Sequence, residues 1–446
     1  MPDGVRHSPR DEFAITRVST IFAKHLSFRH ALHPAGQLLL VVLPLMLLPG
    51  IAGAAVWKAK HKWDDSWDLK YSQWMEENWK TDFFMNPERP AFYKLKHDCG
   101  DAPYFSRIAF AWEHKLPFAI HDPLRKGKRL TQATRKFDHI KDPVKRLRAF
   151  MDFIAGRVST RSLPADTYPI ALKTLRPGDI YVSPGNHVYQ IVGIDDTGVP
   201  TVLSSTTPRK VRYLLYFRGF PMFVPSDAKG QTDGYRRFRR PQDLDKPFNK
   251  LPDYSSEQYK VAKAAGYRFD RFSNALKQLL GKRPETSQEQ IRRMVNEMCN
   301  LVRERKDYVD EGFAYLQKIR AKGRRCMNKQ EYYHYSTVSR DQRLGAFFNQ
   351  NRREMNHLAM RGADPDAMRL LRAVFQPEEP PAAMSQRLRR ICSIPSEVPD
   401  YPLLDLRDVW LAIWTGKLVS DPNAPLEHRW GIAKEEWEPS CPVYED

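Results

Sequence analysis

The sequence lacks the features that mark several large classes of protein. It contains no internal repeat, which excludes a solenoid or a propeller. It has no zinc-finger spacing and no RNA-reading motif, so we expect no specific nucleic-acid partner. His97, His114 and His121 form no recognisable ligand set with carboxylates, so we expect neither a metal nor another cofactor.

Acidic residues are also scarce relative to basic ones. The 446 residues include 53 Asp and Glu against 72 Lys and Arg, a formal net charge of +19. Such a surplus favours contact with a polyanion, for example nucleic acid, anionic lipid or an acidic wall polymer. A basic surface without a dedicated partner is the alternative. Hydrophobic residues make up 41% of the chain, enough to bury a substantial core.

The first 55 residues have the layout of a secretory signal peptide. A polar segment with several arginines precedes the apolar run 38–48, Pro49-Gly50 ends that run, and Ala52-Gly53-Ala54-Ala55 offers a small-residue cleavage site. The uncharged stretch 34–57 is also just long enough to remain as an N-terminal membrane anchor. Either way, we expect the protein to be exported to the periplasm, the cell envelope or the medium.

Export bears on the few cysteines. The chain has five: Cys99, Cys299, Cys326, Cys392 and Cys441. An odd number leaves one thiol unpaired in an oxidising compartment. The simplest division places two disulfides in the C-terminal half and leaves Cys99 free, although the sequence does not fix the pairing. Five unpaired, buried cysteines in a reducing compartment are the alternative.

The stretch 95–112, LKHDCGDAPYFSRIAFAW, places a cysteine at the start of a predicted helix. Apolar residues follow Cys99 at helical spacing. Asp98 is a candidate N-cap, because its carboxylate can accept hydrogen bonds from the first turn. The positive end of the helix dipole would favour the thiolate form of Cys99 and so its nucleophilicity.

A candidate base lies further along the chain. From residue 175 the pattern changes to period two and predicts an antiparallel meander, with His187 opening the strand 187–194. If the turn is centred on residues 196–197, His187 faces Ser205 or Thr206. Ser204, Ser205 and Asp195 are therefore candidates to orient the imidazole.

Two further segments have an ordinary structural interpretation beside a functional one. The tryptophan-rich stretch 57–84 predicts a helix that packs its aromatic side chains onto the domain, rather than a carbohydrate-stacking surface. The segment 234–241, GYRRFRRP, predicts a last strand whose aromatics pack and whose arginines face solvent, with polyanion binding as the alternative.

After residue 250 the chain is predicted to be almost entirely helical. The periodicity indicates helices at 256–280, 287–321, 329–336, 340–356, 364–375, 383–391 and 406–415. We therefore divide the chain into the N-terminal segment 1–55, an α+β domain at 56–250 and a helical domain at 251–446.

Three segments in this order resemble the NlpC-type cell-wall cysteine peptidases and their CHAP-domain relatives. They are Asp98-Cys99 opening a helix, Arg176-Pro-Gly-Asp179 leading into a strand, and the strand 187–194, HVYQIVGI. The resemblance covers about residues 93–217. It implies a papain-like fold, a helix packed on an antiparallel sheet, with Cys99 as the nucleophile and His187 as its base.

These observations predict an exported cysteine hydrolase, an amidase or endopeptidase, acting on peptidoglycan peptides or another envelope amide. In that reaction the imidazole takes the thiol proton and later gives it to the leaving amine. The alternative is a non-catalytic envelope-binding protein with a degenerate papain-like domain. An anchored scaffold protein that uses the helical half is a third interpretation.

Overall fold

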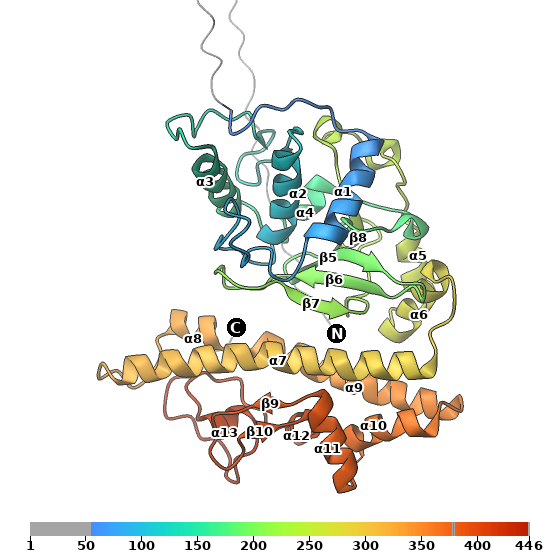
Figure 1. Cartoon of the computed structure of the whole chain (residues 1–446), viewed down its shortest axis with the longest axis vertical. Coiled ribbons are helices and arrows are strands. Elements are labelled where there is room, and N and C mark those ends of the chain that lie inside the picture. Colours follow the sequence, from blue (N-terminus) through green and yellow to red (C-terminus); the bar gives the residue numbers. More distant parts are fainter. Residues whose placement is uncertain (1–54, 377, 379, 445–446) are drawn as a thin grey trace, which may run out of the picture. The chain divides into compact units, whose positions relative to one another are not determined.

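A six-stranded antiparallel sheet lies at the centre of the α+β part of the chain (Figure 1). The computed structural model describes residues 55–376, 378 and 380–444, all within a unit that begins at Gly53. The predicted signal peptide or anchor therefore lies outside the described residues, except for its last residues, 55–57. In sheet order the strands are β3 (Thr167–Pro169), β8 (Gly234–Phe238), β4 (Ile180–Ser183), β5 (His187–Ile194), β6 (Pro200–Ser204) and β7 (Leu215–Arg218).

Strands β4 to β7 form the predicted meander, and their register is close to the expected one. Gln190 faces Leu203 and Ile191 faces Val202. The last strand of the meander, β7, begins at Leu215 and has four residues. β8 then returns to lie between β3 and β4, so that it is an inner strand of the sheet.

Both faces of the sheet are covered by helices. On one face the alternate residues Ile180 and Val182 join a core with helices α1 (Asp65–Asn78), α2 (Asp101–Glu113) and α3 (Pro143–Ala155). Tyr181 points to the other face, where the core includes residues of α5 (Glu257–Ala264) and α6 (Phe269–Leu280). The tryptophans of the 57–84 stretch belong to the first core, as the packing interpretation predicted. Residues 119–131 form a hairpin of β1 (Ala119–His121) and β2 (Arg129–Thr131).

The helix predicted for residues 256–280 is interrupted at its middle. Gly266 and Tyr267 both have positive φ angles, 62° and 54°, which an α-helix does not accommodate. The chain therefore turns between α5 and α6, and both helices pack on the sheet. The predicted boundary at residue 250 runs just ahead of this pair of helices, which share one core with the strands.

The rest of the chain is helical, as expected. The 34-residue helix α7 lies beside β7 and packs against most of the later helices. The elements are α7 (Ser287–Arg320), α8 (Lys329–Tyr335), α9 (Val338–Met360), α10 (Pro365–Phe375), α11 (Ala382–Ile391), α12 (Leu406–Trp414) and α13 (Leu426–Arg429), with the short strands β9 (Ile394–Pro395) and β10 (Leu403–Leu404). The remaining short elements are α4 (Leu163–Asp166) and three 3₁₀ turns at Leu172–Thr174, Pro241–Asp243 and Phe248–Lys250.

Two disulfides hold this helical part together. Cys299 pairs with Cys392 and Cys326 pairs with Cys441, and Cys99 is the free thiol. The predicted division of the five cysteines is confirmed. Two disulfides are compatible with a chain that matures in an oxidising compartment.

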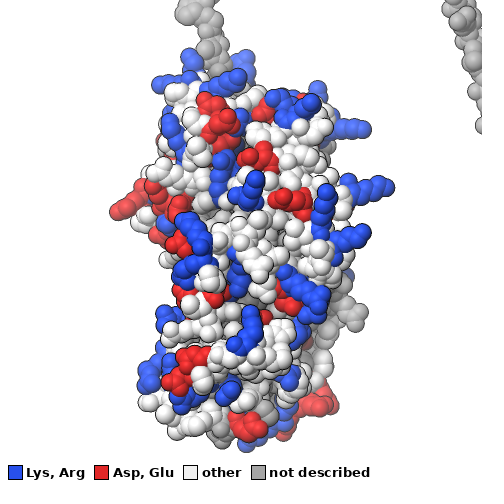
Figure 2. Space-filling model, turned by 90° about the vertical axis from the view of Figure 1, so that its right-hand side faces the viewer, with Lys and Arg blue, Asp and Glu red and all other residues white. Residues whose placement is uncertain are grey.

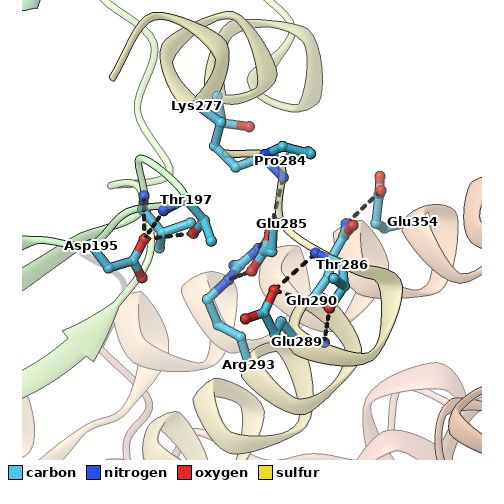
Figure 3. A network of polar contacts seen from close by, with 12 residues as sticks. Asp195, Thr197, Lys277, Pro284, Glu285, Thr286, Glu289, Gln290, Arg293 and Glu354 are labelled. Carbon is cyan, nitrogen blue, oxygen red and sulfur yellow. Dashed lines mark hydrogen bonds and ion pairs between the residues drawn. The ribbon is translucent and has the colours of Figure 1, made fainter. Parts of the chain in front are cut away.

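A buried carboxylate fixes the start of α7 to α6 (Figure 3). Both oxygens of Glu285 are bonded by Arg293, at 2.8 and 2.9 Å, and one of them lies 3.0 Å from Nζ of Lys277. Burial acts to raise the pKa of Glu285, but the charges and hydrogen bonds of these two cations outweigh it, so the pKa is lowered. Next to it, Thr286 and Glu289 form a reciprocal capping box that begins the helix.

The arginines of the segment 234–241 do not all face solvent, contrary to our expectation. Arg236 and Arg237 are buried, because β8 is an inner strand covered on both faces. The guanidinium of Arg237 bonds both oxygens of Asp179, at 2.7 and 2.9 Å, and also reaches Asp253. Asp179 is the acid of the P-G-D segment, so two sequence motifs meet in one buried ion pair.

Basic side chains are spread over the surface shown in Figure 2, and acidic side chains lie among them. The net charge of +19 is thus not gathered into one basic patch on this face.

Candidate functional site

Cys99 and His187 line the same cavity, although 88 positions separate them in the chain. The cavity has a volume of about 560 Å³ and is also lined by Thr206, Phe223 and residues of α9. Cys99 lies just before α2, and His187 is the first residue of β5. The packing of α2 against one end of the sheet brings the thiol and the imidazole to one space.

The turn before α2 is fixed by side-chain caps and a close backbone contact. The carboxylate of Asp98 accepts from the N–H groups of Gly100 and Asp101, at 2.8 and 3.1 Å. The N-cap position is Gly100 rather than Asp98, but Asp98 satisfies the first-turn donors as expected. A Cβ on Gly100 would lie 2.8 Å from the Cα atom of Ser159, so this position requires glycine.

The thiol of Cys99 is not activated in the way that the sequence suggested. Burial, followed by the charge of Asp98, raises the pKa of Cys99 to about 12. Hydrogen bonds from the backbone N–H groups of Gly100 and Cys99 itself oppose this rise only in part. The desolvation of a 7% exposed thiol outweighs the favourable end of the helix, so the resting form is the neutral thiol.

His187 is buried, and no hydrogen bond joins its ring to another group in the described residues. The residue is 8% exposed, and Nε2 is a buried atom without a partner. The ring packs edge-on against Tyr189, with centroids 4.6 Å apart. Burial, followed by the charges of Arg343 and Arg340, lowers the pKa of His187 to about 3. The imidazole is therefore neutral, and its Nε2 is an unpaired nitrogen shielded from solvent.

The serines expected to orient His187 are engaged elsewhere. Nε2 of His97 lies 3.2 Å from the carbonyl oxygen of Arg212, which can only accept, so this nitrogen carries the proton. Nδ1 of His97 then accepts from the Ser205 hydroxyl at 2.8 Å. Ser204 lines a separate cavity of about 180 Å³.

The sheet register explains this arrangement. Continuing the pairing of Gln190 with Leu203 places Thr206, not Ser205, opposite His187. Thr206 lines the cavity, and its hydroxyl accepts from Arg340. Asp195, the other candidate, lies at the far turn and bonds Thr197 and Arg218. We therefore correct the assignment of a serine or Asp195 as the orienting group.

Two charged residues of the cavity were not predicted from the sequence. Arg340 and Arg343 lie one turn apart on α9, and both line the cavity beside Cys99 and His187. Their i, i+3 spacing predicts a shared helical face, but nothing in the sequence shows that this face meets a strand more than 130 residues earlier.

No group of three or more His, Cys, Asp or Glu side chains is placed to hold a metal ion within the range 55–444 that the structure describes, gaps excepted. In the same part of the chain, no helix combines the length and apolar character needed to cross a bilayer. Comparison of the chain with protein-family models, curated proteins and solved structures gives no match.

Proposed function

We propose that the protein is an exported cysteine hydrolase, an amidase or endopeptidase with a papain-like arrangement of the NlpC type. The observation that carries this proposal is the shared cavity of Cys99 and His187, whose imidazole makes no hydrogen bond to another described residue. Peptidoglycan peptides or another envelope amide are the proposed substrates. The two disulfides are compatible with an exported protein.

The proposed chemistry uses only these two side chains and water. His187 accepts the thiol proton, and the sulfur of Cys99 attacks the amide carbonyl. The C–N bond breaks as the imidazolium gives its proton to the leaving amine, and water then hydrolyses the thioester. The backbone N–H of Cys99 is a candidate donor to the oxyanion.

A digestion assay tests the proposal. The full chain is incubated with insoluble peptidoglycan, and the release of soluble peptides and new amino groups is measured. We expect release by the wild type and its loss in Cys99→Ala and His187→Ala. His139→Ala is the matched control, because His139 is exposed and does not line the cavity. Release by Cys99→Ala at the wild-type rate would contradict the proposal.

One set of observations favours a non-catalytic envelope-binding protein instead. The pKa of Cys99 is raised and that of His187 is lowered, so proton transfer between them is uphill, and no other residue that the structure describes bonds the imidazole. This alternative predicts that wild type and Cys99→Ala sediment equally with peptidoglycan, with no release by either.

A further inference from the structure

Helix α9 forms one wall of the cavity that contains Cys99 and His187. Five residues from the first turns of α9 line this cavity: Ser339, Arg340, Gln342, Arg343 and Ala346. This helix lies well outside residues 93–217, which carry the resemblance to cysteine peptidases. The helical half thus completes the site rather than standing apart from it.

The cavity has an uncompensated positive charge. Two arginines and no carboxylate line it. Arg343 is neutralised by Glu304 of α7, whose oxygen lies 2.5 Å away. Arg340 is half-buried and makes no ion pair with any acid in the described residues, so no carboxylate there offsets its charge.

Arg340 is nevertheless held in one position. Its Nη2 donates to the Thr206 hydroxyl at 3.1 Å and to the Thr207 carbonyl at 2.7 Å. The guanidinium carbon lies 3.3 Å from the centre of the Tyr308 ring, a stacking geometry that orients the plane. Nε is buried without a partner, and no hydrogen bond within the described residues uses Nη1.

The guanidinium is held next to the imidazole. Thr206, to which Arg340 donates, lies opposite His187 in the continued register of the sheet. The charge of Arg340 also contributes to the lowered pKa of His187, which reflects the same proximity. A bound anion would offset that charge.

We propose that Arg340 is a specificity-determining residue that binds a carboxylate of the substrate beside the bond that Cys99 attacks. This inference rests on the proposed hydrolase function and narrows its substrates to amides that carry a negative charge near the scissile bond. The Nη1 group of Arg340, which no hydrogen bond within the described residues uses, can donate to such a carboxylate. Arg343 also lines the cavity, but Glu304 pairs with its charge, so Arg340 is the main source of positive potential there.

Alkylation of Cys99 by two small probes tests the inference without knowledge of the substrate. Iodoacetate carries a carboxylate and iodoacetamide a neutral amide, and with either one the sulfur displaces iodide. Cys99 is the only free thiol, so mass spectrometry of the intact, unreduced protein measures both rates at pH 9. The readout is the rate ratio of iodoacetate to iodoacetamide, compared with that of free cysteine.

We expect the wild-type ratio to exceed that of free cysteine and to fall with added salt. Arg340→Gln should lower the ratio about fivefold, the size expected for one unit charge several ångströms away in a partly solvated site. Arg340→Lys keeps the charge and should stay within about twofold of the wild type. Arg353→Gln, the same change at an exposed position of α9 outside the cavity, should leave the ratio unchanged.

The outcomes separate the two proposals. If neither reagent labels Cys99, the thiol is inaccessible, and the proposed hydrolase function falls together with this inference. If iodoacetamide labels Cys99 but the wild-type ratio equals that of free cysteine and ignores salt, only the carboxylate site is overturned. The salt measurement needs no variant, so it decides the matter even if Arg340→Gln does not fold. Equal losses in Arg340→Gln and Arg340→Lys would also overturn it.

Discussion

Removing one partner of the ion pair between Arg237 and Asp179 should destabilise the protein strongly. The two side chains are 8% and 2% exposed, and two hydrogen bonds join them. Arg237→Leu leaves the carboxylate of Asp179 buried without its cation, which should lower the free energy of unfolding by about 3–5 kcal/mol. Asp179→Asn leaves Arg237 bonded to Asp253, so its cost should be smaller, roughly 1–3 kcal/mol.

Urea unfolding at neutral pH, followed by tryptophan fluorescence with the disulfides intact, measures both changes. Asp253→Asn is the control, because Asp253 is 40% exposed and should contribute less than about 1 kcal/mol. The double variant Arg237→Leu with Asp179→Asn should be no less stable than Arg237→Leu alone, since it no longer buries a lone charge. A loss below about 1 kcal/mol in Arg237→Leu, or strictly additive effects, would refute the reasoning.

Three further predictions follow from the packing, the buried acid and the cysteines. Gly100→Ala should destabilise the protein by about 1–3 kcal/mol in the same urea assay, because the new Cβ would collide with the backbone of Ser159. Gly345→Ala on α9 is the control: its Cβ makes only ordinary contacts, so it should stabilise the protein by about 0.5–1 kcal/mol. Equal effects of the two substitutions would contradict this. Because the pKa of Glu285 is lowered, its contribution to the free energy of unfolding is present above pH 4.5 and is lost as the pH falls below that value. Glu285→Gln should therefore flatten the acid side of the curve of stability against pH. An unchanged slope would contradict this. Alkylation of the unfolded protein should detect one thiol before reduction and five after it. In the folded protein, the alkylation rate of Cys99 should rise about tenfold per pH unit from pH 7 to 11, because its pKa is about 12. A plateau of the rate near pH 8 would contradict this and show that the site stabilises the thiolate.

Much of the fold follows from local patterns in the sequence. The 3.6-residue period places α7 within one residue of its observed ends, since an amphipathic pattern and a capping box are local signals. The period-two segments give the meander and its register. The break between α5 and α6 was missed because only the backbone angles of Gly266 and Tyr267 show it.

The errors concern long-range packing. The position of β8 inside the sheet buries Arg236 and Arg237, and no periodicity within GYRRF distinguishes an inner strand from an edge strand. That Cys99 and His187 line one cavity could be expected from their order and context, because a helix packed on a sheet brings its start near a strand end. The presence of the α9 arginines in this cavity could not be predicted, since it depends on how the helical half packs against the sheet. The protonation state of Cys99 could not be predicted from the sequence either, because it depends on how deeply the thiol is buried.

The two disulfides overlap along the chain: the loop closed by Cys299 and Cys392 contains Cys326, whose partner Cys441 lies beyond it. Oxidation of thiols in the order in which they are synthesised would instead join Cys99 with Cys299 and Cys326 with Cys392. Correct maturation therefore depends either on delaying oxidation until the tail has arrived or on thiol–disulfide exchange that undoes the premature bonds. Yield in an oxidising host should accordingly respond to the supply of a disulfide isomerase.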